Sequence, residues 1–231
     1  GSAPLSEQAL HDFNAKFKKA TLLEGYGLSE CSPAVSVNRL ERQKALSVGL
    51  PLPSYEVKIV NEEMMEVKTG TVGEIMVKGD CVMQGYLNQA DATDETIING
   101  WLFTGDLGKK DEDGFIYIVD RKKDLIISKG INIYPREIEE IIYKYDGVDS
   151  VAVIGLKDAT KDEDVLAFIQ PKESIELQEM ELRQYLKKHL ANFKLPKHIY
   201  FVEELPKNAT GKVLKRVLKE RVQSGGLLRK K

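Results

Sequence analysis

The spacing of apolar residues changes along the chain, and its first stretch predicts a helix followed by a strand. Three apolar residues recur at intervals of three and four, which predicts an amphipathic helix that Ser6 can cap and that extends to about Lys19 (Leu10, Phe13 and Phe17). Residues 21–23 predict a short strand that runs into residues 24–30, where two glycines flank a tyrosine. This segment is either the ligand-binding edge of a sheet or an ordinary tight turn, and two glycines alone favour the turn.

From Ser47 onward the pattern changes to short runs in which apolar and polar residues alternate, broken by Gly and Pro. A period of two predicts β-strands, here at residues 57–60, 73–79, 101–103 and 115–119. Residues 91–96 predict a short capped helix, and Thr104-Gly105-Asp106 and Asp113-Gly114 predict turns. We expect this block to form a small antiparallel sheet or barrel.

A charged segment, Asp120-Arg121-Lys122-Lys123-Asp124, separates this block from the next. Beyond it, Lys129-Gly130 lies between two apolar runs, which predicts a hairpin, and Pro135 predicts the start of a helix that ends at Gly147. Two buried strands, a helix, a short strand and a last helix follow, with polar loops between them (151–154, 165–169, 182–190, 199–202 and 213–222; loops 157–164 and 206–212). We expect a compact α+β domain.

Composition narrows the class of protein. The 231 residues suffice for two packed domains, and 34 Lys and Arg against 36 Asp and Glu give a net charge of −2, which argues against a nucleic acid as the main partner. Cys31 and Cys81 have no metal-ligand spacing and are interpreted as small core residues in a reducing compartment. With no apolar run near the roughly 20 residues of a membrane span and no signal peptide, we expect a cytoplasmic protein, peripheral membrane contact being left open.

Five side chains each have an ordinary explanation when they are taken singly. Asp106 offers two acceptor oxygens and Arg121 a fixed fork of donors, yet a turn aspartate and a surface ion pair account for them. Tyr26 can pack in a core, and Glu30 can lie in solvent. Lys212 lies in a polar loop, where a lysine is ordinarily just solvated.

Four segments taken together resemble the adenylate-forming superfamily, which includes acyl-CoA synthetases, beetle luciferases and peptide-synthetase adenylation domains. They are residues 25–30, 101–106, 120–130 and 206–212. The resemblance covers nearly the whole chain and is closest to bacterial long-chain fatty acyl-CoA ligases. It implies a two-step reaction: a carboxylate attacks the α-phosphorus of ATP, giving acyl-AMP and pyrophosphate, and the thiol of CoA then displaces AMP.

The resemblance also implies roles in the first step. Asp106 and Arg121 would bind the ribose of the nucleotide, and Tyr26 would stack on adenine. The other implied nucleotide-binding residues are Ser2, Ala3, Gly27 and Ser29, the last standing where the family usually has Thr. Glu30 would hold Mg²⁺, and Lys212 would be the catalytic residue, neutralising charge between the acid and the α-phosphate.

For the second step the resemblance implies a rotation of the small domain. Lys123 matches the family's hinge, which absorbs that rotation. The rotation would withdraw Lys212 and bring in the Lys129-Gly130 hairpin, where Gly130 leaves room for the pantetheine arm of CoA. Gly130 is also explained as a hairpin glycine with positive φ, and both explanations can hold at once.

The implied fold class is α/β and α+β, in two parts. Residues 1–120 would be the C-terminal part of the large AMP-binding domain, with a β-rich, barrel-like subdomain at 45–120. Residues 121–223 would be the small α+β domain with a hinge at 121–124, and residues 224–231 a flexible tail.

The family's Ser/Thr/Gly-rich phosphate loop does not occur in the sequence. We therefore expect the C-terminal portion of a longer ligase, unable to complete adenylation alone; Gly1-Ser2 is either native or a cloning remnant. The leading hypothesis is an ATP-dependent fatty acid:CoA ligase that uses ATP, Mg²⁺ and CoA. The alternatives are a ligase for another carboxylic acid or a carrier protein, a non-catalytic nucleotide- or partner-binding module, and a luciferase-like oxygenase.

Overall fold

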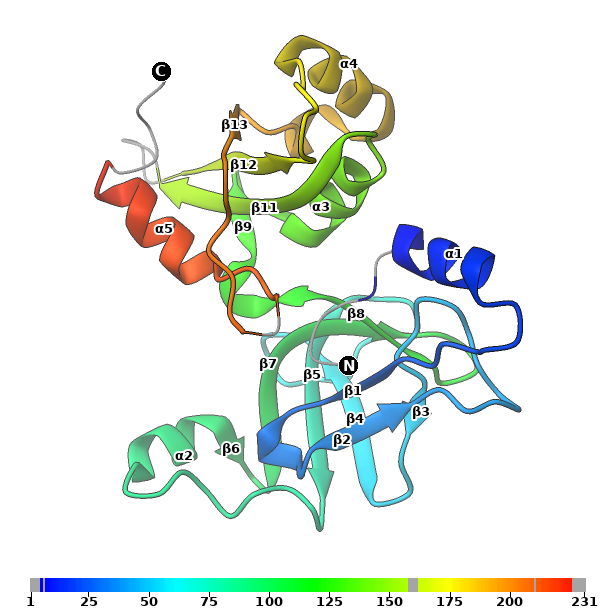
Figure 1. Cartoon of the computed structure of the whole chain (residues 1–231). Coiled ribbons are helices and arrows are strands. Elements are labelled where there is room, and N and C mark those ends of the chain that lie inside the picture. The colour runs from blue at the N-terminus through cyan, green and yellow to red at the C-terminus, as the bar shows by residue number, and fades with distance from the viewer. Residues whose placement is uncertain (1–4, 6, 158–161, 210, 226–231) are drawn as a thin grey trace. The chain divides into compact units, whose positions relative to one another are not determined.

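The computed structural model describes residues 5, 7–157, 162–209 and 211–225. It divides into two compact units, Gly1–Lys123 (unit 1) and Asp124–Lys231 (unit 2), and each is described by itself (Figure 1). The division falls inside the segment 121–124 where the sequence predicts a hinge. The mixed α and β fold class predicted from the sequence is confirmed. No helix in the described residues is long and apolar enough to span a membrane.

Unit 1 begins with one helix and a small antiparallel sheet. Helix α1 spans Glu7–Lys16, and the sheet has the order β1-β2-β3 (Gly25–Gly27, Ala34–Val37 and Leu50–Pro51), with the 3₁₀ turn η1 (Ser29–Cys31) between its first two strands. The predicted strand at 21–23 is wrong, because the strand begins at Gly25 and contains both glycines. A Cβ at Gly27 would lie 1.8 Å from the carbonyl oxygen of Pro33, so only glycine permits this close pairing.

The larger sheet of unit 1 is antiparallel and five-stranded. Its order is β4-β5-β7-β6, and β8 pairs with the later part of β7 (Tyr55–Val60, Gly73–Gly79, Trp101–Lys110, Ile97–Ile98 and Ile116–Arg121). Helix α2 (Ala90–Thr96) precedes β6, and the expected side-chain cap at its start is not formed. Alternate strand residues enter one apolar core, as the period of two predicts (Val57, Ile59, Ile75, Val77, Leu102 and Ile116).

The predicted turn at Thr104-Gly105-Asp106 is wrong, because β7 continues through it. Phe103 pairs with Met76 and Leu107 with Glu74, so three residues of β7 face the single residue Ile75. This is a β-bulge, and Gly105 adopts φ +68°, which glycine tolerates best. The bulge changes the direction in which the following side chain, Asp106, points.

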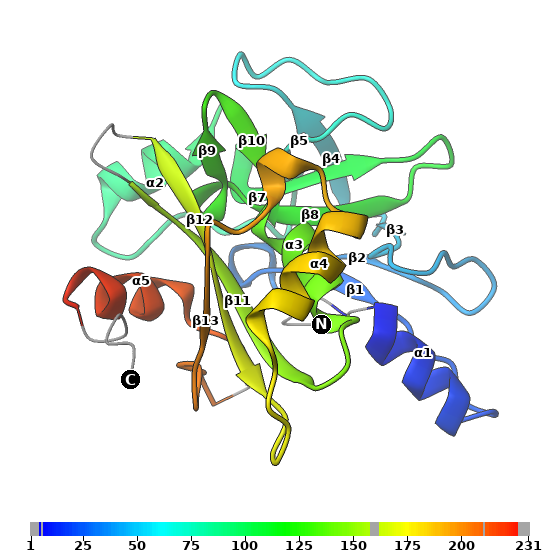
Figure 2. The ribbon, with the colours of Figure 1, turned by 90° about the horizontal axis from the view of Figure 1, so that it is seen from above.

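Unit 2 is a three-stranded sheet covered by helices on both faces. The sheet has the order β11-β12-β13, with the first pair antiparallel and the second parallel (Val148–Lys157, Glu163–Pro171 and His198–Phe201). Helices α3 (Pro135–Tyr143) and α4 (Glu179–His189) pack on one face, and α5 (Lys215–Gln223) packs on the other (Figure 2). Alternate residues of β11 and β12 enter the two cores, so these strands are apolar on both sides.

The smaller elements of unit 2 test the sequence predictions closely. The hairpin of β9 (Ile126–Ser128) and β10 (Ile131–Ile133) is confirmed, with φ +51° at Lys129 and +74° at Gly130, as a type I′ turn requires. Helix α3 ends at Tyr143, earlier than predicted, and Gly147 with φ +88° serves the turn into β11. The 3₁₀ turns η2 (Lys122–Asp124), which spans the boundary between the units, and η3 (Asn192–Lys194) complete the elements.

One further prediction needs correction. Cys31 is buried as expected, but Cys81 is exposed, because it follows the end of β5 where the chain turns into solvent. The segment 206–212 is a loop as predicted, and it forms a hairpin closed at its base: Lys207 bridges Val213, and Leu214 N donates to Pro206 O at 2.7 Å. Thr210 and residues 226–231 lie outside the described residues.

Candidate functional site

Asp106 occupies the centre of a polar group inside unit 1. The bulge places its carboxylate in the interior, where only 7% of the residue is exposed. Thr104 stabilises this turn of the chain, because its Oγ1 donates to Ile75 O at 2.8 Å and accepts from Asp106 N at 3.1 Å. A buried carboxylate needs partners to be stable, so its surroundings are informative.

Each oxygen of Asp106 has one partner from a different strand. The hydroxyl of Tyr26, in β1, donates to Oδ2 at 2.7 Å. Arg121 stands opposite Asp106 in the β7–β8 ladder, and its Nε lies 3.3 Å from Oδ1. The structure thus brings together three of the residues singled out by the sequence, from positions 26, 106 and 121.

The protonation of Tyr26 follows from this placement. Burial of the ring raises the pKa of Tyr26 far above its ordinary value, and the negative charge of Asp106 raises it further. The phenol therefore stays neutral and donates to Asp106. Tyr26 is also half-buried and packs against the core of unit 1.

Asp106 keeps the capacity to bind a further ligand. An ionised carboxylate has about four lone-pair positions, and the hydrogen bond from Tyr26 and the ion pair with Arg121 occupy one on each oxygen. About half of the Arg121 side chain is exposed, and the atom that lies beside Asp106 is Nε. A carboxylate with spare acceptor positions beside a guanidinium suits adjacent hydroxyl groups, as on a sugar ring.

Glu30 lies in η1 and is held by a residue that the sequence analysis missed. Tyr86 donates from its hydroxyl to Glu30 Oε1 at 2.9 Å, and burial and the charge of Glu30 raise the pKa of Tyr86. Within the described ranges no group of three or more His, Cys, Asp or Glu side chains could hold a metal ion. A single carboxylate fits Mg²⁺, which takes one or two carboxylates and completes its shell with water and phosphate oxygens.

The structure describes some, but not all, of the other residues of unit 1 that the sequence predicts to contact the nucleotide or to form the hinge. Gly27, the last residue of β1, and Ser29, the first residue of η1, are exposed and lie on the same short segment as Tyr26 and Glu30. Ser2 and Ala3 lie outside the described residues. Lys123 is exposed and is the last residue of unit 1.

Glu74 is a second residue that the sequence analysis missed. One of its oxygens accepts from Gly105 N at 3.2 Å, and the other accepts from Lys122 Nζ at 2.7 Å. The available signal is a lone acidic residue directly before the apolar run Ile75-Met76-Val77 of the strand Gly73–Gly79. For Tyr86 no comparable signal exists in the sequence, because its partner lies 56 positions away.

The predicted CoA-access residues lie on the β9–β10 hairpin of unit 2. Lys129 N donates to Asp162 Oδ1 at 2.7 Å, which fixes the turn to the start of β12. A Cβ built on Gly130 meets no atom of the described residues within 4 Å. Ile127 and Ile131 on the same hairpin are exposed at 52% and 42% and give it an apolar surface.

Lys212 lies in the closed hairpin that precedes α5. Its backbone N donates to Asn208 Oδ1 at 2.9 Å, and Asn208 N donates to Lys212 O at 2.9 Å. The hairpin is attached to the body of unit 2 by Lys215, whose Nζ lies 2.8 Å from Glu139 Oε1 of α3. Both of these side chains are largely buried, so the lysine-bearing hairpin has a firm base.

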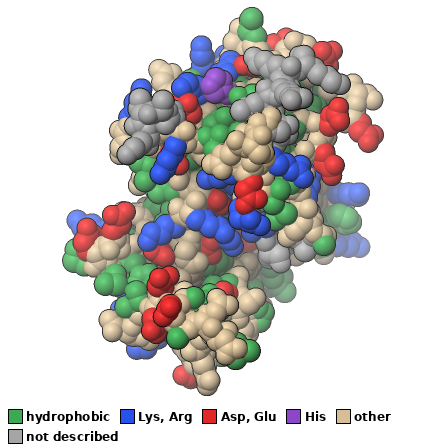
Figure 3. Space-filling model, turned by 90° about the vertical axis from the view of Figure 1, so that its left-hand side faces the viewer, with side chains coloured by type: hydrophobic (Ala, Val, Ile, Leu, Met, Phe, Trp, Pro, Cys, Tyr) green, Lys and Arg blue, Asp and Glu red, His purple; other side chains and the backbone are tan. Residues whose placement is uncertain are grey.

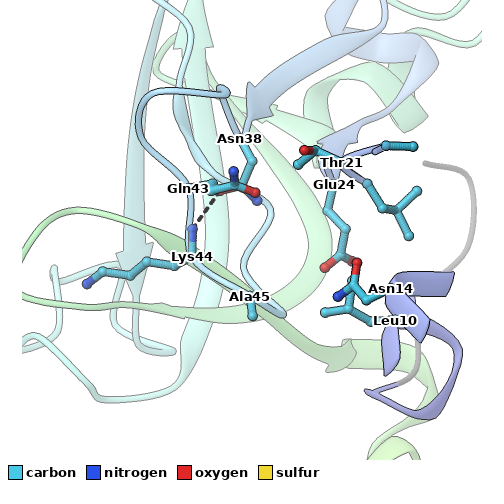
Figure 4. A pocket seen from close by; sticks show the side chains of 10 residues that line it. Leu10, Asn14, Thr21, Glu24, Asn38, Gln43, Lys44 and Ala45 are labelled. Carbon is cyan, nitrogen blue, oxygen red and sulfur yellow. Dashed lines mark hydrogen bonds between the residues drawn. The ribbon is translucent and has the colours of Figure 1, made fainter. Parts of the chain in front are cut away.

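A polar cavity of about 240 Å³ lies where α1 meets the segment 38–45 (Figure 4). Glu24 and Asn14 point toward each other there, and Lys44 N donates to Asn38 Oδ1 at 3.1 Å. None of the predicted site residues that the structure describes lines it. On the face shown in Figure 3, basic side chains lie among acidic ones, in keeping with the small net charge.

Two family models match the chain. The model described as AMP-binding enzyme matches residues 1–87, and the model described as AMP-binding enzyme C-terminal domain matches residues 137–212. The first match contains Tyr26 and Glu30, and the second contains Lys212. Asp106 and Arg121 fall between the two matched ranges.

Three curated relatives that are similar to this chain are named as ligases. The long-chain-fatty-acid–CoA ligase of Salmonella typhimurium is 47% identical over 200 residues, 86% of this chain and 36% of the relative. That of Bacillus subtilis is 45% identical over 210 residues, 89% of this chain and 38% of the relative. The 2-succinylbenzoate–CoA ligase of a Geobacillus strain is 39% identical over 207 residues, 89% of this chain and 42% of the relative. The chain spans somewhat more than a third of their length.

Solved structures give the same answer for the fold. ATP-bound MatB from Rhodopseudomonas palustris is 36% identical with a TM-score of 0.92, covering 98% of this chain and 45% of that protein. The o-succinylbenzoate coenzyme A synthetase of Bacillus subtilis, in complex with ATP and a magnesium ion, is 35% identical with a TM-score of 0.83. That match covers 94% of this chain and 44% of that protein.

Proposed function

Because the chain belongs to the adenylate-forming family of AMP-binding enzymes, we propose that it is the C-terminal part of an ATP-dependent long-chain fatty acid:CoA ligase. The observation that carries the proposal is the meeting of Tyr26, Asp106 and Arg121 in unit 1. Long-chain-fatty-acid–CoA ligases at 47% and 45% identity support the choice of substrate.

In the proposed enzyme, Asp106 and Arg121 bind the ribose of the nucleotide. The free acceptor positions of Asp106 receive the two ribose hydroxyls, and the exposed donors of Arg121 reach the same sugar. Tyr26 holds the carboxylate in place through its hydroxyl and offers one ring face to adenine, beside Gly27 and with Ser2 and Ala3.

Phosphate binding falls to the η1 segment. Ser29 offers its hydroxyl to a phosphate oxygen, and Glu30 supplies one carboxylate ligand to Mg²⁺. When bound, the ion neutralises the charge of the phosphates as pyrophosphate leaves. Tyr86 orients Glu30 for this role by occupying one carboxylate oxygen, which leaves the other to face the ion.

The chemical step of adenylation rests on Lys212. The carboxylate of the fatty acid attacks the α-phosphorus, and negative charge accumulates on the oxygens between them. A lysine ammonium placed there stabilises the transition state electrostatically and needs no proton transfer. The closed hairpin and the Lys215–Glu139 pair give this lysine a fixed base in unit 2.

Thioester formation requires unit 2 to turn about Lys123. The turn withdraws Lys212 and presents the Lys129-Gly130 hairpin, past which the pantetheine thiol reaches the acyl-AMP. The open space over Gly130 and the exposed Ile127 and Ile131 suit a slender, partly apolar arm. The thiol attacks the acyl carbon, AMP leaves, and the thiol proton passes to solvent.

A second candidate is a ligase for a different carboxylic acid. The 2-succinylbenzoate–CoA ligase is 39% identical, and the long-chain-fatty-acid–CoA ligase of Haemophilus influenzae is 39% identical as well. Identity at this level therefore does not separate the two substrates. Most of the acid-binding pocket is expected upstream of the residues in this chain.

The test is a screen of carboxylic acids with the full-length parent, reading pyrophosphate release with ATP and Mg²⁺ for each acid. Turnover confined to acids with long alkyl chains supports the proposal, and turnover only with an aromatic or dicarboxylic acid selects the second candidate. The 231-residue chain itself should show no turnover with the same mixture, because it lacks a phosphate loop. The absence of pyrophosphate release with every acid would leave a non-catalytic module as the better reading.

A further inference from the structure

Glu74 connects the two segments of unit 1 on which ribose binding depends. Its side chain is only 11% exposed, and each carboxylate oxygen has a different partner. Oε1 accepts from the backbone N of Gly105, inside the bulge that presents Asp106. Oε2 accepts from Lys122 Nζ, on the residue that follows Arg121. We call Glu74, Gly105 and Lys122 the Glu74 bridge.

The bulge makes this connection possible. In a regular ladder the N–H of Gly105 would bond to a strand or face solvent, but here Thr104-Gly105-Asp106 face Ile75 alone. Thr104 Oγ1 accepts a hydrogen bond from Asp106 N at 3.1 Å, and Glu74 accepts one from Gly105 N. Removing Glu74 would leave the Gly105 donor without this acceptor, a costly change in a half-buried site.

The other end of the bridge lies at the last residues of unit 1. Arg121 is the final residue of β8, and unit 1 ends at Lys123, two residues later. The last pair of a ladder opens most readily, and here that pair is Asp106 with Arg121. Lys122 attaches the chain to Glu74 of β5 just beyond this pair. We therefore expect that rotation of the segment after Lys122 leaves the Asp106–Arg121 pair closed.

We propose that the Glu74 bridge confines the rotation of unit 2 to Lys123 and beyond, so that Arg121 and Asp106 retain the nucleotide while the units change orientation. This inference rests on the proposed function. It assigns Glu74 and Lys122 as positioning residues, acting through Arg121 and Asp106. Without the bridge, rotation spreads back to Arg121, and the acyl-AMP formed in the first step escapes before CoA reaches it.

Escape has a chemical signature. Acyl-AMP released into solution reacts with water, so that the acyl–oxygen–phosphorus link is cut at the acyl carbon and gives the free acid and AMP. A coupled enzyme releases one AMP for each thioester formed. An uncoupled one releases more AMP than thioester, whatever its overall rate.

The first experiment uses the 231-residue chain and does not depend on the proposed function. Hydrogen exchange of the peptide covering residues 103–107 is compared between wild type, Glu74→Ala and Lys58→Met. Lys58 is the control, because its Nζ lies 3.4 Å from Glu56 and 4.6 Å from the ring centre of Trp101 on the same sheet, both outside the bridge. We expect exchange roughly tenfold faster in Glu74→Ala and unchanged in Lys58→Met. Equal exchange rates in all three proteins would show that Glu74 does not stabilise the bulge, and would overturn the proposed role of the Glu74 bridge.

The second experiment uses the full-length parent and measures AMP and thioester in the same reaction. Lys122→Met should release on the order of two or more AMP per thioester, Lys122→Arg should return the ratio toward one, and Lys58→Met should leave it at one. The double variant Glu74→Gln, Lys122→Met should have an AMP-to-thioester ratio no higher than that of the more affected single variant, because both substitutions remove the same contact. A ratio of one AMP per thioester in Lys122→Met would overturn the proposed role of the Glu74 bridge and leave the proposed function standing. A wild-type parent that forms no adenylate would overturn both.

Discussion

The hydroxyl of Tyr26 donates a hydrogen bond to Asp106 Oδ2 at 2.7 Å, although the two residues lie 80 positions apart. The contact joins the small sheet of unit 1 to the large one. It also explains why a buried carboxylate is tolerated beside the core. The first prediction tests this contact.

Replacing Tyr26 by Phe should destabilise unit 1, because Asp106 loses a donor in a site with little access to water. A hydrogen bond to a charged group is worth about 1.5–3 kcal/mol, and we expect a loss in that range. Urea unfolding followed by the fluorescence of Trp101, the single tryptophan, reports on unit 1. Tyr117→Phe is the control, since Tyr117 OH donates to Asp111 Oδ2 at a longer 3.2 Å. A loss for Tyr26→Phe no greater than for the control would contradict the prediction.

Lys212→Ala in the full-length parent should slow adenylation and spare thioester formation from supplied acyl-AMP. Loss of one electrostatic donor to a transition state costs about 10²–10³ in rate. The two half-reactions are measured separately, by pyrophosphate exchange and by thioester formation. Lys207→Ala is the matched control, because Lys207 lies on the same hairpin opposite Val213. Equal damage to both half-reactions by Lys212→Ala would argue against two orientations of unit 2.

Gly130→Leu should have the opposite effect, blocking thioester formation while pyrophosphate exchange continues. A Cβ added at Gly130 meets no atom of the described residues within 4 Å, so we expect any block to come from what approaches the hairpin. The positive φ adds a strain of about 1–2 kcal/mol. Gly70→Leu controls for that strain, since Gly70 has φ +82° and equally open surroundings in another turn. Normal thioester synthesis in Gly130→Leu would remove this glycine from the path of CoA.

The stability of unit 1 in acid should depend on Asp111. Burial acts to raise the pKa of this carboxyl, but hydrogen bonds from Lys44 Nζ, Phe115 N and Tyr117 OH outweigh it, and the pKa falls below its ordinary value. A depressed pKa stabilises the folded state above the unfolded value of about 3.9, and that contribution is lost as the pH falls through the folded value.

Asp111→Asn should therefore lower the urea midpoint of unit 1 clearly at pH 7 and less at pH 3. The wild-type chain loses the charged contacts in acid, and the variant lacks them at both pH values. Glu112→Gln, at the exposed neighbouring position, should shift neither midpoint. The same difference between wild type and Asp111→Asn at both pH values would show that the carboxylate charge is not the cause.

Regular elements could be predicted from the sequence because each follows from a local pattern. The period of two in β4 and β5, and Lys129-Gly130 between two apolar runs, specify strands and a hairpin without reference to the rest of the chain. The strand expected at 21–23 failed because three apolar or β-branched residues resemble a strand whether or not a partner is present. The partner, β2, lies opposite Gly25–Gly27 instead.

Site residues could be predicted where a family pattern marks them. The residues that hold them in place could not be predicted. Asp106 and Arg121 stand in recognisable segments, but their pairing depends on the β7–β8 register. The contact of Glu74 with Lys122, which holds the chain next to Arg121, is not visible in the local sequence. The sequence predicts a turn where the structure has the bulge that turns Asp106 inward, because Thr-Gly-Asp suits both. A bulge is defined by the strand opposite, which the local sequence does not contain.

The turn that joins β7 to β8 limits how this protein can diverge. It is closed by Asp111 N donating to Phe115 O and Gly114 N donating to Asp111 O, each at 3.0 Å. An insertion or deletion there either breaks these bonds or slides β8 by one residue, which turns Arg121 to the opposite face, away from Asp106. Descendants of this gene should accumulate substitutions at exposed Glu112 freely, yet keep the number of residues between Asp106 and Arg121 unchanged.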